Sequence, residues 1–139
     1  MTIEMLEQYY GIVSNIRAID EDIKHLYSPI SSPNGRPQDG HSNTPSAPTE
    51  RSAMRIIALK DQMEAERERM EQMRDEIEQW LSTCDDAEIC AIVRWRFIHR
   101  KNWSEVNKQV YGYPSYNYSR RKCIRYFEKE NKHGERKSN

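Results

Sequence analysis

The segment 102–127 constrains the fold more than any other part of the chain. Asn102 is a favourable N-cap residue, and Glu105 three positions later completes a capping box, so a helix is expected to begin after Asn102. Gly112, with a proline two residues later, ends that helix, because glycine tolerates the left-handed backbone and proline cannot continue a helix. Ser115 can cap a following helix. The segment therefore predicts two helices joined by a tight turn.

The second of these helices is basic. It carries Arg120, Arg121, Lys122 and Arg125, with Glu128 as its one acid. A short capped helix, a tight turn and a basic helix are what reading of the DNA major groove requires. We therefore interpret the segment as a DNA-binding helix-turn-helix.

The side chains expected to contact DNA divide into base readers and phosphate contacts. Asn117, Tyr118 and Arg121 are expected to reach base edges, because Asn can read adenine and Arg can read guanine. Basic side chains that precede the motif are expected to contact phosphates, which fix register without reading sequence: Arg94, Arg96, Arg100 and Lys101. The complete set of expected DNA-binding residues is Arg100, Lys101, Ser115, Asn117, Tyr118, Arg120, Arg121, Lys122 and Arg125.

The other reading of this basic cluster is an ordinary solvated helix face. The neighbouring aromatic side chains also have two possible uses, because they can stack on bases or fill the core of a three-helix unit. Burial preferences favour the core for these side chains: Trp95, Phe97, Trp103 and Tyr113. The chosen helix register also places Tyr116, Cys123 and Phe127 on the inner face.

The same region follows a longer pattern. An aromatic-basic stretch (residues 94–98) is followed by Trp103-Ser104-Glu105-Val106, by Gly112-Tyr113, and by a Ser-led helix that ends in basic and bulky residues. In this pattern residues 86–127 resemble region 4 of bacterial sigma factors. More closely, they resemble small phage transcription regulators of the ArpU/RinA type, which often carry an N-terminal helical region with a Ser/Pro/Gly-rich interruption.

Two positions depart from the family's pattern. Asn107 stands where the family usually has a small residue, which implies a wider crossing of the two helices or a hydrogen bond across it. Tyr111 is an extra residue before Gly112 and shifts the possible register of the recognition helix by one position.

The resemblance implies a sequence-specific DNA-binding regulator of phage or prophage transcription that works in the cytoplasm of a bacterial host. Its partners would be double-stranded DNA and, through the remaining helices, a second copy of the chain or RNA polymerase. Two alternatives stay open: a small terminase-like DNA-packaging subunit, and a protein–protein adaptor with a vestigial helix-turn-helix.

The rest of the chain predicts two long helices. In residues 3–27 and about 50–81, apolar side chains recur in steps of three and four, which is typical of a heptad seam. The first seam comprises Met5, Tyr9, Ile12, Ile16, Ile19, Ile23 and Leu26, and the second comprises Ile56, Leu59, Met63, Met70, Met73, Ile77 and Trp80. An antiparallel hairpin or a dimeric coiled coil would bury both. The longer second seam leaves a free end for a second subunit or the DNA-binding part.

The predicted fold is therefore all-α. Residues 1–84 form the long-helix hairpin, with a flexible linker at 28–49 that is rich in Pro, Gly and Ser. Residues 85–130 form the helix-turn-helix domain, and 131–139 form a disordered basic tail.

Charge divides the chain in the same way. The sequence has 22 Lys and Arg against 22 Asp and Glu, but residues 89–139 hold 13 basic and 4 acidic side chains, a balance of +9. Residues 1–88 carry the opposite balance of −9. This asymmetry indicates a basic nucleic-acid-binding part and an acidic part that does not touch phosphates.

Catalysis finds no support in the sequence. The four histidines are scattered, no Gly-rich phosphate loop is present, and Cys84, Cys90 and His99 lack convincing zinc-ligand spacing. Three cysteines without pairing logic suit a reducing compartment, and no apolar run predicts a membrane span or signal peptide. We expect an intracellular protein that is not an enzyme and has no catalytic residue, metal or cofactor.

Overall fold

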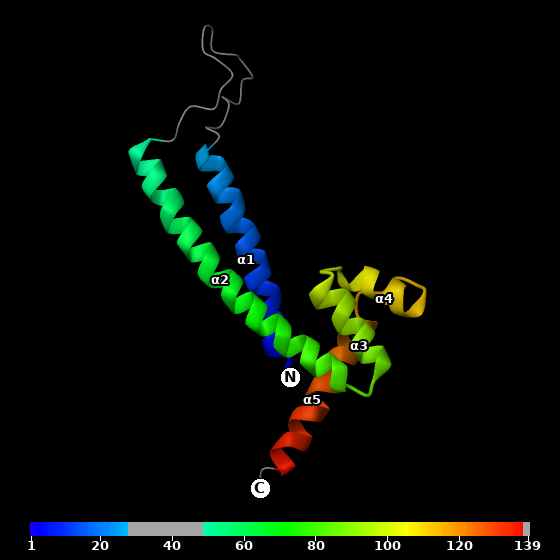
Figure 1. Cartoon of the computed structure of the whole chain (residues 1–139). Coiled ribbons are helices and arrows are strands. Elements are labelled where there is room, and N and C mark those ends of the chain that lie inside the picture. Colours follow the sequence, from blue (N-terminus) through cyan, green and yellow to red (C-terminus); the bar gives the residue numbers. More distant parts are fainter. Residues whose placement is uncertain (28–48, 138–139) are drawn as a thin grey trace. The chain divides into compact units, whose positions relative to one another are not determined.

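The computed structural model describes residues 1–27 and 49–137, and every regular element in them is a helix (Figure 1). The elements are α1 (Ile3–Tyr27), α2 (Glu50–Thr83), α3 (Ala87–Val93), the π-helical turn η1 (Arg94–Ile98), α4 (Trp103–Tyr111) and α5 (Tyr118–Lys137). The prediction of an all-α chain is confirmed. Apart from Thr49, the predicted linker at 28–49 lies outside the described residues. Within the described ranges, no helix is long and apolar enough to cross a membrane.

The chain divides into two compact units. The first unit comprises Met1–Ile12 and Met70–Asn139, and the second unit comprises Val13–Arg69. In the second unit, α1 and α2 share a core to which both predicted seams contribute. Its buried members are Ile19, Ile23 and Ile56, and Leu26, Leu59 and Met63 pack against them. The heptad positions therefore face one another in this unit.

The core of the first unit gathers side chains from the start of α1, the end of α2 and all later helices. Its buried apolar members are Leu6, Tyr9, Ile12, Ile77, Leu81, Ile89, Ile92, Val93, Phe97, Val106, Cys123 and Phe127. The Trp80 ring lies 5.4 Å from the Phe127 ring and 6.4 Å from the Tyr126 ring, measured between centroids. The far end of the second seam thus packs on α5, which is one of the two occupants expected for it.

The start of α3 explains the acidic residues before it. Asp86 is the N-cap, and its Oδ1 accepts a hydrogen bond of 3.1 Å from the Ile89 N–H. Glu88 adds a second negative charge to the first turn, where the helix dipole favours it. These acids therefore have a local structural purpose.

Both ends of α5 differ from the prediction. The helix begins at Tyr118 instead of directly after Ser115, and its first backbone hydrogen bond runs from the Arg121 N–H to the Asn117 carbonyl (2.9 Å). Asn117 therefore occupies the N-cap position, while Ser115 accepts only a long bond of 3.4 Å from the Tyr118 N–H. At the other end α5 continues to Lys137, so residues 131–137 are helical although a disordered tail was expected. Residues 138 and 139 lie outside the described part.

Candidate nucleic-acid interface

Helix α4 begins and ends as its sequence predicts. Asn102 Oδ1 accepts a hydrogen bond of 2.8 Å from the Glu105 N–H. The carboxylate of Glu105 bonds to Gln109 instead of returning to the cap, so only half of the capping box forms. Gly112 has a φ of +87°, the left-handed conformation that glycine adopts without steric cost, and its N–H bonds to the Lys108 carbonyl.

Asn107 connects α4 to the turn and to α5. Its side chain is fully buried. Its Nδ2 donates to the Tyr113 carbonyl at 2.7 Å, and its Oδ1 accepts from the Ser119 hydroxyl at 2.6 Å. Of the two consequences expected of Asn107, the structure has the hydrogen bond across the helix crossing. Because buried polar groups are costly to leave unpaired, this amide fixes how α5 is held against α4.

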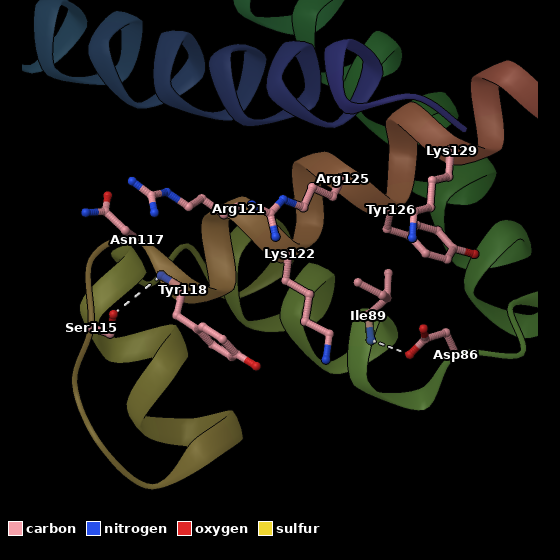
Figure 2. Close-up of a pocket in the computed structure, with 10 residues that line it drawn as sticks. All are labelled: Asp86, Ile89, Ser115, Asn117, Tyr118, Arg121, Lys122, Arg125, Tyr126 and Lys129. Atoms are coloured by element: carbon pink, nitrogen blue, oxygen red, sulfur yellow. Dashed lines mark hydrogen bonds between the residues drawn. The ribbon is translucent and has the colours of Figure 1, made fainter.

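Helix α5 has an inner and an outer face. Ser119, Cys123 and Phe127, spaced four residues apart, are buried. The outer face carries a second series at the same spacing, and its four members are exposed and follow one another along the helix (Figure 2): Asn117, Arg121, Arg125 and Lys129. We call these four residues the outer row.

The outer row borders a groove of about 590 Å³ between α5 and the start of α3. The groove is lined by Asp86, Ile89, Ser115, Asn117, Tyr118, Arg121, Lys122, Arg125, Tyr126 and Lys129 (Figure 2). Six of the expected DNA-binding residues are therefore together: Ser115, Asn117, Tyr118, Arg121, Lys122 and Arg125. Lys129 was missed, although its position four residues after Arg125 was a signal that could have found it.

The cations of the groove are not equivalent. Lys122 Nζ lies 2.5 Å from Glu88 Oε2, and this hydrogen-bonded pair raises the pKa of Lys122 and lowers the pKa of Glu88. Arg121, Arg125 and Lys129 are exposed, and none of them forms an ion pair with another described residue. Among the described cations that line the groove, only these three carry charge that is open to an external anion.

Two arginines expected to contact phosphate are engaged inside the first unit. The Arg100 guanidinium lies 3.9 Å from the centre of the Tyr10 ring and donates a hydrogen bond of 2.9 Å to the Tyr10 carbonyl. The Arg96 guanidinium lies 4.6 Å from the Tyr10 ring and 5.0 Å from the Trp103 ring. Both side chains hold the start of α1 against η1 and α4.

The remaining expected contacts lie apart from the groove. Arg120 lines a separate hollow of about 80 Å³ that includes Glu7 and Tyr10. Arg94 forms an ion pair with Glu78 at 3.3 Å. Lys101 is exposed but does not line the groove.

The aromatic residues divide differently from the prediction. Phe97 is buried, and Trp95 and Trp103 are half-buried, as core packing requires. Tyr113 is instead 51% exposed, and Tyr116, which was expected on the inner face, is 72% exposed. The reason is the late start of α5, which leaves Tyr116 in the turn.

Among the described residues, no three His, Cys, Asp or Glu side chains are grouped so that they could hold a metal ion.

Comparison with protein-family models, with curated proteins and with solved structures finds no match to this chain.

Proposed function

We propose that this protein binds double-stranded DNA in a sequence-specific manner and regulates transcription, with α4, the turn and α5 acting as a helix-turn-helix. The observation that carries the proposal is the outer row, in which one amide and three cations are exposed and follow one another along α5, and none of the cations forms an ion pair with another described residue. The resemblance to ArpU/RinA-type regulators supports phage or prophage genes as the targets.

The dimensions of the outer row suit the major groove. Asn117 and Lys129 are twelve residues apart in the sequence, which corresponds to about 18 Å along a helix. The major groove is about 12 Å wide, so the first part of the row can enter it while the last part reaches the backbone. Recognition helices contact base edges near their N-termini. We therefore assign base contacts to Asn117 and Arg121 and phosphate contacts to Arg125 and Lys129.

The long helices supply the second half of the proposed mechanism. In the second unit they pack through their seams. We propose that they form an antiparallel hairpin that dimerises or contacts RNA polymerase. The negative balance of residues 1–88 keeps this part away from phosphates. A dimer would bind a palindromic target, because half-sites follow the two-fold axis of the protein.

Arg120 and Arg121 provide a matched pair for the test. They are adjacent, carry the same charge and are both exposed, but only Arg121 lines the groove. The target would first be selected from a randomised duplex pool, and the affinity of each variant would then be measured at two salt concentrations.

We expect Arg121→Ala to weaken binding to the selected site by about tenfold to a hundredfold and to relax base preference at one position. Arg120→Ala should change affinity by less than about threefold, the small effect of removing one exposed charge that lies outside the groove. Lys129→Ala should reduce the slope of log affinity against log salt by about 0.9. Equal losses for Arg120→Ala and Arg121→Ala, or selection without an enriched motif, would contradict the proposal.

A further inference from the structure

A cluster of tyrosines that the outer row does not explain lies in the turn before α5 and at the helix ends that flank it. The sequence has 8 tyrosines, and four of them lie within 111–118: Tyr111, Tyr113, Tyr116 and Tyr118. The exposed fractions of the last three are 51%, 72% and 48%. Tyr116 is the most exposed large hydrophobic side chain in the described part of the chain.

Tyr111 holds part of this cluster in place. Its half-buried ring meets the Tyr118 ring nearly edge-on at 5.0 Å and lies 6.5 Å from the Tyr113 ring. The Lys122 ammonium lies 5.7 Å from the centre of the same ring. Tyr113 and Tyr118 therefore each pack against the Tyr111 ring. No ring contact to Tyr116 occurs among the described residues.

The charge and the exposed side chains around the tyrosine cluster indicate which kind of partner it can bind. No acidic residue occurs anywhere in 106–127, and the open cation Arg121 lies three residues after Tyr118. Every exposed large hydrophobic side chain of the described first unit is a tyrosine, so its most exposed apolar groups are aromatic rather than aliphatic. Exposed aromatic rings beside open cations are what single-stranded nucleic acid requires, since bases stack on the rings and phosphates meet the charges.

We propose that Tyr113, Tyr116 and Tyr118 form a stacking surface for unpaired bases at the edge of the duplex that α5 holds. The inference rests on the proposed function and deepens it, because it makes the preferred ligand a duplex with a locally opened strand. In an intact duplex the base faces are covered by their neighbours, so these rings have nothing to stack on. Binding would therefore favour an opened site over a closed one.

The test compares two probes that share the selected site. One is fully paired, and the other has a few mismatched, unpaired bases at one end of the site. A 2-aminopurine among the unpaired bases reports stacking directly by a change of its fluorescence. The full-length protein would be used with Tyr116→Ala, Tyr116→Phe and, as a control for the loss of an exposed tyrosine from the second unit, Tyr27→Ala.

The native protein should bind the opened probe about tenfold more tightly than the paired probe, and Tyr116→Ala should remove most of that preference. Tyr116→Phe and Tyr27→Ala should keep the preference, because the phenylalanine ring stacks as well as tyrosine. Equal binding of both probes, or a Tyr116→Phe variant as weak as Tyr116→Ala, would overturn the stacking surface. The paired probe keeps the two proposals separable, because the proposed function fails only if that probe is not bound specifically.

Discussion

Two pairs of arginines on the same unit have opposite surroundings. Arg96 and Arg100 pack against the Tyr10 ring, and Arg100 also donates to the Tyr10 carbonyl. Arg121 and Arg125 are exposed on α5, with no ion pair to any described residue. All four contribute equally to the positive balance of residues 89–139, so net charge alone does not locate an interaction surface.

The two pairs differ in their hydration and in the partner that each guanidinium can still bind. A guanidinium over an aromatic ring has already lost part of its hydration and gained a local partner, so it stabilises the fold. An exposed guanidinium keeps its hydration until an anion displaces it, so it stabilises a complex. The first pair should therefore affect unfolding, and the second pair should affect DNA affinity.

The largest expected effect comes from removing the ring that the first pair shares. Tyr10→Ala takes away the surface for both guanidiniums and the edge contact with Phe97, whose ring centre is 6.4 Å away. We expect the free energy of unfolding to fall by about 2–4 kcal/mol and the melting temperature to fall by on the order of 10 °C. Thermal and urea unfolding would measure both quantities.

Tyr10→Phe is the control, because it keeps the ring and should cost less than about 1 kcal/mol. Below its melting temperature, Tyr10→Ala should retain the native salt dependence of DNA binding. A changed salt slope would break the comparison, since it would mean that the first pair also meets phosphate.

The second expected effect concerns the amide that holds the outer row in position. Asn107→Ala leaves the Ser119 hydroxyl and the Tyr113 carbonyl without their buried partner, so we expect a loss of about 2 kcal/mol. Urea unfolding of the native protein, both single variants and Asn107→Ala with Ser119→Ala would give the coupling energy. We expect about 1 kcal/mol of coupling, and additive losses would show that the 2.6 Å bond contributes nothing.

Sequence reasoning predicted what periodicity and capping determine. The bounds of α1, the cap at Asn102 and the break at Gly112 follow from local chemistry, and all are present in the structure. The inner positions Cys123 and Phe127 also follow, because four-residue spacing places them on one helix face.

What sequence reasoning missed depends on contacts between distant segments. The engagement of Arg100 by Tyr10 joins residues 90 positions apart, so no local pattern could predict it. Tyr116 was expected on the inner face because Ser115 was expected to cap α5, and the shift of the cap by two residues, from Ser115 to Asn117, leaves Tyr116 in the turn. Lys129 was overlooked although its spacing from Arg125 was visible in the sequence.

A smaller effect on stability is expected at Arg100, where the side chain stabilises the fold and the backbone conformation destabilises it. Arg100 has a φ of 60°, a left-handed conformation that costs a non-glycine residue about 1 kcal/mol. Arg100→Ala loses the contacts with Tyr10 and keeps that strain, whereas Arg100→Gly loses the same contacts and relieves it. We expect the glycine variant to be the more stable of the two by about 1 kcal/mol, measured by urea unfolding. Equal stabilities would mean that the backbone relaxes once the side chain has gone.

The smallest effect is expected at Lys122, which shares features of the internal cations and of the exposed cations. Lys122 lines the groove with the outer row but is paired with Glu88, as the internal arginines are paired with Tyr10. Glu88→Gln should free Lys122 and raise DNA affinity at low salt by about twofold to fivefold. Because both side chains are about one-third exposed, the loss of stability should be below about 1 kcal/mol.

The pH dependence of this loss has a definite sign. Lys122 lowers the pKa of Glu88, so the stabilisation is fully present above the ordinary carboxyl pKa of about 4.5 and disappears as the pH falls through the lowered value. The stability difference between native protein and Glu88→Gln should therefore shrink as the pH falls below about 4.5. Glu71→Gln, which removes an exposed acid without an ion pair among the described residues, should show neither the gain in affinity nor this pH window. If Glu88→Gln leaves DNA affinity unchanged, Lys122 belongs with the internal cations, and the open charge of the groove is confined to the outer row.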